Sequence, residues 1–428
     1  MRSHRRRDRA AWWPLLLIAI PFLIRPELIG GDEPHYAAVA VSIAADFDFD
    51  PSNQYAESRE GVRPSAGSRA LGRPLDEHLV DKPAGRVSSH PIGMPLFAAP
   101  FLAIPWRLGI PGMPDLVLGL LTVLISFLGY RALSALAGEW LGEPRGGRVV
   151  AAITFFSTPL WFYSRTFFTE PWLAAALVGA LWAVRHGRVV VAGLLLGAAL
   201  MIKEQALLPS LFIVGWAIPR SGWRRALGLL PGLLLAGAGF VARNVLLYGS
   251  SWVDFPQHFR KGDVLDGIAG LAVDPARGIV WFAPVVLLGI LLLPGLRKQS
   301  GALPAAACFA AFYLLQAAWI DWRGGSGFGP RLLVPVLPLL ALPVALAWRE
   351  RARTPWLRVA LCLLAAAGIA VEVVAISNPF KAFWSPSLGD LLFASASRGA
   401  TGLGAAAIAF GLCWRATGPE AARSPVAP

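Results

Sequence analysis

The chain has 428 residues, of which 56% are hydrophobic and 15% charged, and its formal net charge is +13. Soluble domains average about 45–50% apolar and about 25% charged residues, so this composition excludes an ordinary soluble enzyme. The three cysteines lie inside apolar runs, which excludes a disulfide framework or a cysteine-based zinc cluster. The Lys and Arg residues are scattered between apolar runs and not along one face, so they do not indicate a nucleic-acid surface.

Apolar runs recur along the whole chain, separated by short breaks that carry arginine. A bilayer core about 30 Å thick needs roughly 20 apolar residues per helix, so the sequence predicts an all-α, polytopic transmembrane bundle of about 12 spans. We expect one transmembrane domain over 1–415 and a short cytoplasmic tail over 416–428. The predicted spans are 11–29, 115–138, 149–164, 170–186, 188–202, 205–219, 225–245, 278–296, 301–320, 331–348, 355–376 and 397–415.

The basic residues set the expected orientation, because Lys and Arg accumulate in cytoplasmic loops. The N-terminal residues 1–9 and every arginine-bearing turn fall on one side of the predicted bundle, so both termini are expected inside. Residues 30–114 then form one long external loop. Segment 91–106 contains four prolines and is expected to be a re-entrant or juxtamembrane helix within this loop, since a full crossing there would reverse the basic turns.

Two acidic motifs lie at the predicted outer face. GDEPHY places Asp32 and Glu33 directly after the first span, and FTEP places Glu170 at the start of a later span. Acidic residues also favour the first turn of an ordinary helix, so a purely structural role is an alternative for both motifs. Ionisable groups at a membrane mouth are, however, often functional.

Cationic residues lie at the same predicted face. Lys203 lies between two short spans, where a plain ion-paired hairpin tip is equally plausible. Arg331 follows the glycine-rich segment 322–330, which suits a close approach to an anion but also an ordinary turn. Lys82 and Arg243 are further external cations, each of which can also be an interfacial anchor.

The chain shows no legible Ser/His/Asp or Cys/His arrangement and no His-x-x-x-His spacing, which disfavours a classical zinc hydrolase. Acids beside external cations suit attack of a hydroxyl on an activated carbon that bears a phosphate leaving group. One acid removes the hydroxyl proton, and cations or a divalent ion stabilise the departing phosphate.

At these residues the sequence resembles the C-type membrane glycosyltransferases, a superfamily that includes protein O-mannosyltransferases and the lipid A aminoarabinose transferases. GDEPHY resembles the Asp-Glu-x-x-Tyr start of that family's first external loop, and FTEP stands where the family has a second external acid. DKPAGR and HPIGMPLFAAP are similar to its juxtamembrane stretch. WRGGSGFGPRLLVP is similar to its Trp-x-Gly-Gly…Gly-x-Arg-Tyr-Leu-x-Pro segment, although Leu332 replaces the tyrosine and Glu170 replaces a frequent aspartate.

The resemblance implies an inverting transfer of a hexosyl or pentosyl group from a polyprenyl-phosphate donor to a glycan, lipid or protein acceptor. The transfer would occur at the periplasmic or exterior face of the bacterial cytoplasmic (inner) membrane. It also implies the roles of individual residues: Asp32, Glu33 and Glu170 as catalytic acids; Lys82, Arg243 and Arg331 as ligands of the donor phosphate; His35, Tyr36, His90 and Lys203 as substrate-binding residues; and Asp32 and Glu170 as ligands of a divalent ion such as Mg²⁺ or Mn²⁺.

Two other classes of function stay open. Twelve spans with broken helices also fit a lipid-linked-sugar flippase or a secondary transporter. A transporter places its ionisable residues near the bilayer midplane, related by repeats, whereas here they cluster at one face and no repeat is visible. A non-catalytic assembly subunit is the third alternative.

Overall fold

The computed structural model describes residues 12–60, 78–82, 85–108, 112–250, 261–297, 302–385 and 387–418. The expectations for the basic residues 1–9 and for most of the tail lie outside these residues. The chain folds as two compact units. Unit 1 comprises Met1–Leu128 and Tyr163–Arg260, and unit 2 comprises Gly129–Phe162 and Lys261–Pro428.

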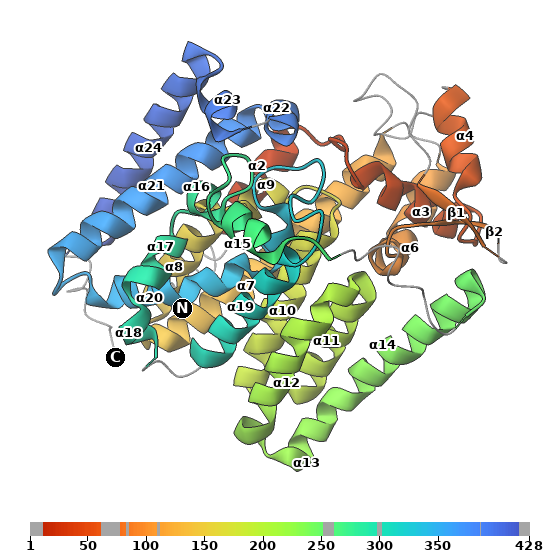
Figure 1. Cartoon of the computed structure of the whole chain (residues 1–428), viewed down its shortest axis with the longest axis horizontal. Coiled ribbons are helices and arrows are strands. Elements are labelled where there is room, and N and C mark those ends of the chain that lie inside the picture. The colour runs from red at the N-terminus through yellow and green to blue at the C-terminus, as the bar shows by residue number, and fades with distance from the viewer. Residues whose placement is uncertain are drawn as a thin grey trace, which may run out of the picture. The chain divides into compact units, whose positions relative to one another are not determined.

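The described residues of unit 1 form helices and one short hairpin (Figure 1). The long helix α7 (Met113–Leu141) begins in this unit and ends in unit 2. The other elements of unit 1 are α2 (Trp13–Ile24), α3 (Glu33–Ala45), α4 (Ser52–Glu60), β1 (Leu79–Lys82), β2 (Gly85–Ser88), α6 (Gly93–Arg107), α10 (Thr169–Arg185), α11 (Val189–Ile202), a 3-10 turn (Glu204–Ala206), α12 (Leu207–Ser221), α13 (Trp223–Ala226), a second 3-10 turn (Leu227–Leu229), α14 (Leu230–Arg243) and a π-helical turn (Asn244–Tyr248).

Helices α10, α11 and α14 lie side by side in unit 1 (Figure 1). Small residues allow α11 and α14 to approach closely, because a Cβ atom at Gly197 would collide with the backbone carbonyl of Gly232. Such small-residue contacts are typical of helices that associate within a membrane.

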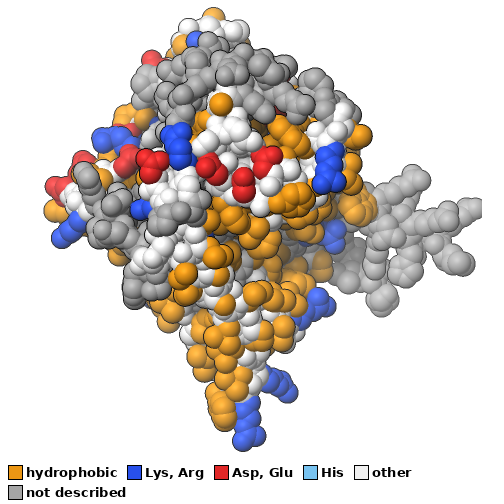
Figure 2. Space-filling view, turned by 90° about the vertical axis from the view of Figure 1, so that its right-hand side faces the viewer, with side chains coloured by type: hydrophobic (Ala, Val, Ile, Leu, Met, Phe, Trp, Pro, Cys, Tyr) orange, Lys and Arg blue, Asp and Glu red, His pale blue; other side chains and the backbone are white. Residues whose placement is uncertain are grey.

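The outward sides of α12 to α14 are strongly apolar. Leu211, Leu234 and Leu235 are among their exposed side chains. In Figure 2 hydrophobic side chains cover the lower part of the visible face, and Lys and Arg side chains lie at its lower tip. An apolar surface that ends in a basic tip suits helices that face lipid and end at a charged membrane interface.

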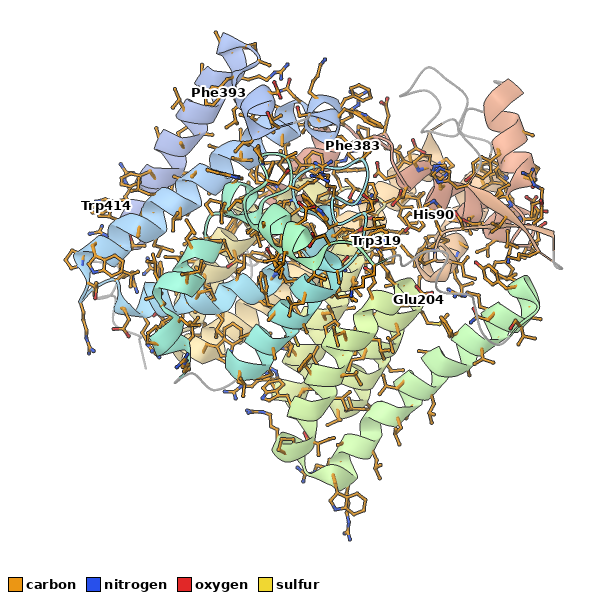
Figure 3. The ribbon with its side chains drawn as sticks, in the orientation of Figure 1. His90, Glu204, Trp319, Phe383, Phe393 and Trp414 are labelled. Carbon is orange, nitrogen blue, oxygen red and sulfur yellow. The ribbon has the colours of Figure 1, made fainter. Side chains whose placement is uncertain are left out.

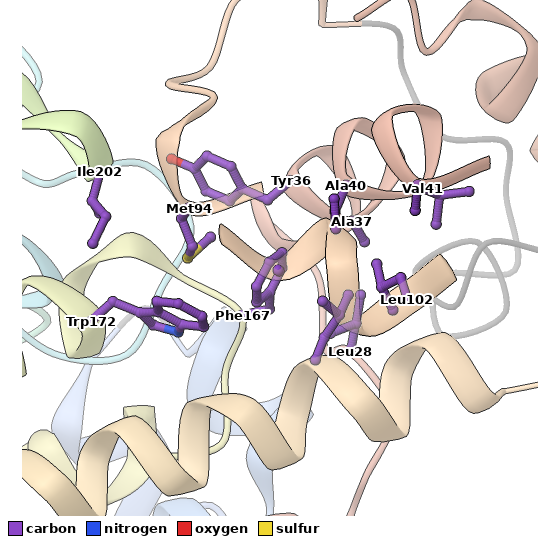
Figure 4. Close-up of a cluster of buried hydrophobic side chains, with 14 residues drawn as sticks. Leu28, Tyr36, Ala37, Ala40, Val41, Met94, Leu102, Phe167, Trp172 and Ile202 are labelled. Carbon is purple, nitrogen blue, oxygen red and sulfur yellow. The ribbon is translucent and has the colours of Figure 1, made fainter. Parts of the chain in front are cut away.

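The hydrophobic core of unit 1 joins the long loop to the helices (Figure 4). Leu28, Tyr36 and Ala40 lie beside Met94 and Leu102 of α6, and Phe167, Trp172 and Ile202 complete the cluster. Helices α3 and α6 therefore form a packed part of unit 1. Segment 91–106 is helical, as expected, but its re-entrant character stays a prediction.

The antiparallel hairpin of β1 and β2 was not expected from the sequence. Val80 pairs with Val87, and Lys82 pairs with Gly85, so the hairpin lies in the same part of the chain as the DKPAGR motif. The two four-residue segments LVDK and GRVS carry one valine each and no extended apolar–polar alternation, so the sequence gives little signal for these strands. The fold is thus all-α with a two-stranded addition in the predicted external loop.

Unit 2 contains the end of α7 and the following helices: α8 (Pro144–Phe156), α9 (Leu160–Tyr163, of which Tyr163 is assigned to unit 1), α15 (Val264–Val273), α16 (Ile279–Phe282), α17 (Val286–Leu291), α18 (Leu293–Leu296), α19 (Ala302–Ala317), a 3-10 segment (Arg331–Leu340), α20 (Ala341–Glu350), α21 (Pro355–Ser377), α22 (Pro379–Trp384), α23 (Leu388–Phe393) and α24 (Ala396–Ala416). Helix α21 lies against α24, and α15 lies against α19 (Figure 1).

Proline interrupts the predicted spans of unit 2. The span expected over 278–296 is three short helices, with Pro284 between the first two and Pro294 in the third. The span expected over 331–348 begins as a 3-10 segment that contains Pro335 and Pro338. Proline removes a backbone donor and clashes with the preceding turn, so these sequences cannot form uninterrupted α-helices.

Among the described residues, four helical stretches are long and apolar enough to cross a membrane, judged by length and composition: Met113–Leu141, Trp223–Tyr248, Arg331–Glu350 and Pro355–Ser377. Other predicted spans correspond to shorter apolar helices, such as Val189–Ile202 and Leu303–Ala317. An all-α membrane protein is therefore supported, and the number of 12 spans stays a prediction.

Candidate active site

The carboxylate of Glu33, in the GDEPHY motif, is fixed by backbone hydrogen bonds. Its carboxylate is fully buried and accepts N–H bonds from Ile29 at 2.7 Å, Gly30 at 3.3 Å and Phe167 at 2.8 Å. These bonds join the turn before α3 to the segment before α10. Glu33 thus fixes the backbone before α3 and before α10, and both of its carboxylate oxygens accept hydrogen bonds.

Arg165, which sequence reasoning did not select, is the cation beside this carboxylate. It is 4% exposed, and its guanidinium donates to the carbonyl oxygens of Arg25 and Glu27. Burial raises the pKa of the Glu33 carboxyl, and the Arg165 charge together with the donated N–H bonds opposes that rise. Because Glu33 and Arg165 are 132 positions apart, no local motif reveals their interaction.

Asp32 lies directly before Glu33, at the start of α3. It occupies the position before the first turn of α3, yet its side chain does not cap that helix, and it is only partly buried. A structural role at the start of the helix stays an alternative for Asp32, although its carboxylate makes no capping bond. Its charge acts on His35, one turn further along the chain.

The second acidic motif forms a buried ion pair. Glu170 is 1% exposed, and its carboxylate accepts from the Lys203 ammonium at 3.1 Å and from the Thr169 hydroxyl at 3.2 Å. The structure therefore brings together two residues that were predicted separately, Glu170 as a catalytic acid and Lys203 as a substrate ligand. Both oxygens of this carboxylate have partners.

Two predicted phosphate ligands lie beside one aromatic ring. The Lys82 ammonium is 5.6 Å from the centroid of Tyr248, and the Arg243 guanidinium is 5.8 Å from it. Arg243 also pairs with Glu204 at 2.7 Å, a residue labelled in Figure 3. Much of the Arg243 charge is balanced by this acid, whereas the described partner of Lys82 is the ring.

Three histidines gather next to Asp32. The rings of His35 and His78 stack with centroids 3.7 Å apart, and His90 (Figure 3) lies 5.2 Å from His35 and 5.2 Å from Tyr36. Burial and the two neighbouring imidazoles lower the pKa of His35 to about 3, so its ring is neutral near pH 7. Of the four residues predicted to bind substrate, His35, Tyr36 and His90 lie together, whereas Lys203 pairs with Glu170.

Arg331 belongs to unit 2, where it begins the 3-10 segment and is buried. The preceding glycines are required by the turn itself. Gly324 and Gly329 have positive φ angles of 69° and 56°, and a Cβ atom at Gly329 would lie 2.8 Å from the Phe282 ring. The conformation of the turn thus explains the glycine-rich sequence, and phosphate binding by Arg331 stays a prediction.

Comparisons with solved structures identify the fold. ArnT from Cupriavidus metallidurans bound to undecaprenyl phosphate matches 95% of this chain and 76% of its own, with 16% sequence identity and a TM-score of 0.50. The chain shares the fold of this ArnT structure. This confirms, at the level of the fold, the resemblance inferred from the sequence motifs.

Two further structures are similar to the chain. The apo state of the same ArnT covers 95% of this chain and 78% of its own, at 16% identity and a TM-score of 0.49. The Archaeoglobus fulgidus oligosaccharyltransferase in the apo form covers 88% and 57%, at 12% identity and a TM-score of 0.47. No protein-family model matches the chain, and no curated protein matches it by sequence.

Proposed function

We propose that the protein is an inverting glycosyltransferase that moves a sugar from a polyprenyl-phosphate donor to a cell-envelope acceptor. The reaction takes place on the outer face of the cytoplasmic membrane. The observation that carries this proposal is the shared fold with ArnT, whose structure contains undecaprenyl phosphate, along 95% of the chain. Lipid-facing apolar helices and a polar, histidine-rich loop agree with a lipid-linked donor.

Asp32 is the proposed general base. Its carboxylate takes the proton of the acceptor hydroxyl while the hydroxyl oxygen attacks the anomeric carbon from the face opposite the phosphate. The bond between the carbon and the phosphate oxygen breaks, and the lipid phosphate leaves as an anion. Glu33 positions Asp32, because two of its backbone bonds fix the turn that precedes Asp32 and the third ties this turn to Phe167.

The leaving phosphate needs a cation whose charge is available. Arg243 is paired with Glu204, and Lys203 is paired with Glu170. Lys82 contacts the Tyr248 ring, so its ammonium is the best available phosphate ligand among the described cations of this group. We assign Lys82 the main contact with the phosphate in unit 1 and Arg243 a supporting contact, and Arg331 of unit 2 stays a separately predicted phosphate ligand.

The proposal also concerns a divalent ion, such as Mg²⁺ or Mn²⁺, that Asp32 and Glu170 would bind. Such an ion would have to compete with the Lys203 ammonium, which is 3.1 Å from one Glu170 oxygen, and with the Thr169 hydroxyl at the other. A carboxylate that is already neutralised attracts a second cation less strongly. The proposed chemistry accordingly uses one base and protein cations.

The decisive experiment follows the donor in proteoliposomes. Purified protein should convert a polyprenyl-phosphate sugar to free polyprenyl phosphate and a glycosylated acceptor, and Asp32→Asn protein should not. A flippase would instead move the intact donor across the bilayer without breaking its sugar–phosphate bond. Transbilayer movement without cleavage, at equal rates for both proteins, would replace the transferase assignment with the flippase alternative.

A further inference from the structure

The three histidines near α3 form the one group of three or more potential metal ligands found among the described residues. His35 lies on α3, His78 precedes β1, and His90 follows β2. Their potential ligand atoms all lie within 4.8 Å of one another. We propose that His35, His78 and His90 bind one divalent transition-metal ion of the Zn²⁺ type. This inference is independent of the donor and acceptor of the proposed reaction.

The orientation of His35 is the first argument for a metal site. Its Nδ1 is 2.6 Å from the hydroxyl oxygen of Tyr55, a fully buried residue of α4. With Nδ1 occupied, Nε2 is the nitrogen left for an ion. Histidine ligands in metal proteins characteristically use their second ring nitrogen in such a bond, which fixes both the tautomer and the ring plane.

The second argument is the arrangement of the other two rings. His78 Nδ1 lies 2.9 Å from His90 Nε2, so one of these nitrogens donates a proton to the other when no ion is bound. An ion between them would replace that proton. Zinc–nitrogen bonds of about 2.0–2.1 Å with tetrahedral angles separate two ligand nitrogens by about 3.4 Å. These two nitrogens therefore need to move apart by only a fraction of an ångström, and the His35 ring, now stacked on His78, must rotate for its Nε2 to face the same ion.

The type of ligand selects the ion. Imidazole suits Zn²⁺, Cu²⁺, Ni²⁺ and Fe²⁺, whereas Mg²⁺ and Mn²⁺ prefer oxygen ligands. The histidine site is therefore distinct from the Mg²⁺ or Mn²⁺ site predicted at Asp32 and Glu170. Three protein ligands leave a fourth tetrahedral position for water or another small ligand.

The bound ion would fix the hairpin to α3. The backbone already draws the two histidine-bearing ends of the hairpin together, since the Ser89 amide donates to the His78 carbonyl at 2.9 Å. Lys82 lies at the end of β1, four residues after His78, and Asp32 immediately precedes α3. An ion that links His78 and His90 to His35 would hold the proposed phosphate ligand in a constant relation to the proposed base.

Metal content of the full-length protein in detergent tests the inference. After chelation and desalting, the protein is incubated with Zn²⁺ or Co²⁺, and bound metal is measured by mass spectrometry. We expect one ion per chain, with Co²⁺ giving the visible absorption of a tetrahedral nitrogen site. His78→Ala and His90→Ala, at the two less buried positions, should each bind at least tenfold more weakly, and Tyr55→Phe about 10–100-fold more weakly.

The matched control is His186→Ala, which changes a histidine at the end of α10 whose Nδ1 contacts the Trp182 carbonyl oxygen. It should bind metal like the unaltered protein. Chelation should lower the Tm of the unaltered protein and of this control, but not that of His78→Ala. This second readout separates loss of a ligand from failure to fold, because unfolded protein gives no cooperative transition.

Two outcomes would overturn the metal site. One is unaltered protein that binds no more Zn²⁺ than the His78→Ala and His90→Ala variants, which would leave a cluster of hydrogen-bonded imidazoles. The other is equal loss of metal in the His186→Ala control. Since metal content is measured without donor or acceptor, a protein that binds no metal at these histidines but still transfers sugar would refute the metal site and leave the proposed function intact.

Discussion

Units 1 and 2 each contain a glutamate that is fully buried, and the two carboxylates are held in different ways. Glu33 in unit 1 accepts three backbone N–H bonds and lies near the Arg165 charge. Glu372 of α21 in unit 2 accepts one N–H bond, from Phe162 at 3.0 Å, and its Oε1 atom has no hydrogen-bond partner among the described residues.

The two carboxylates differ in how far their surroundings stabilise a negative charge. A carboxylate with several donors and a nearby cation keeps its charge at modest cost, whereas a carboxylate with one donor gains little from being charged. Glu33 lies next to Asp32 and fixes the turn that precedes it. Glu372 joins α21 to the short helix α9 and has no described neighbour with a proposed chemical role.

The largest expected effect is that of Asp32→Asn on transfer. Asparagine has nearly the same shape but cannot accept the acceptor's proton, and a positioned general base contributes roughly 10²–10⁴-fold to the rate. Turnover should fall by this factor while Tm stays unchanged. Asp81→Asn is the control, because that carboxylate belongs to the same loop but is 93% exposed. Normal turnover in Asp32→Asn would place the base elsewhere, with Glu170 the next candidate.

Glu33→Gln should primarily reduce stability. The glutamine amide turns one N–H₂ group toward backbone donors and leaves the Arg165 charge without its counter-charge. Removing one partner of a buried charged pair costs about 3–5 kcal/mol, which chemical denaturation in detergent can measure. The double variant Glu33→Gln/Arg165→Met should recover part of the loss. Unchanged stability in the single variant would remove the distinction between the two buried glutamates.

The sequence predicts the helices of both units better than it predicts these carboxylate contacts. Long apolar runs place α7, α11 and α21 within a few residues, because a bilayer imposes a length on each span. The contacts that build the site join distant residues: Glu33 with Phe167, and Glu170 with Lys203. One sequence carries no pattern that pairs such residues, so these pairings could not be predicted, and the functional roles of the residues stay predictions.

Arg331→Ala tests whether unit 2 contributes a charge to donor binding. A guanidinium can hold a phosphate through two parallel hydrogen bonds, and bonds to charged groups contribute about 1.5–3 kcal/mol. The apparent donor affinity should fall by that amount, and Arg331→Lys should restore only part of it because lysine lacks the planar fork. An unchanged donor affinity in the alanine variant would limit the phosphate ligands to unit 1.

The smallest expected effect is that of Glu372→Gln, which is the matched counterpart of Glu33→Gln. Glutamine keeps one oxygen that can accept the Phe162 amide bond, and its N–H₂ group takes the place of an oxygen that has no hydrogen-bond partner. No described cation loses a counter-charge, so the free energy of unfolding should change by less than about 1 kcal/mol, within the range of a single neutral hydrogen bond. Glu372→Leu should cost more, because the buried Phe162 amide then loses its side-chain acceptor. If Glu372→Gln instead destabilises the protein as much as Glu33→Gln, the second carboxylate also carries a charge that the fold requires. Unit 2 would then contain a buried ionic site of its own.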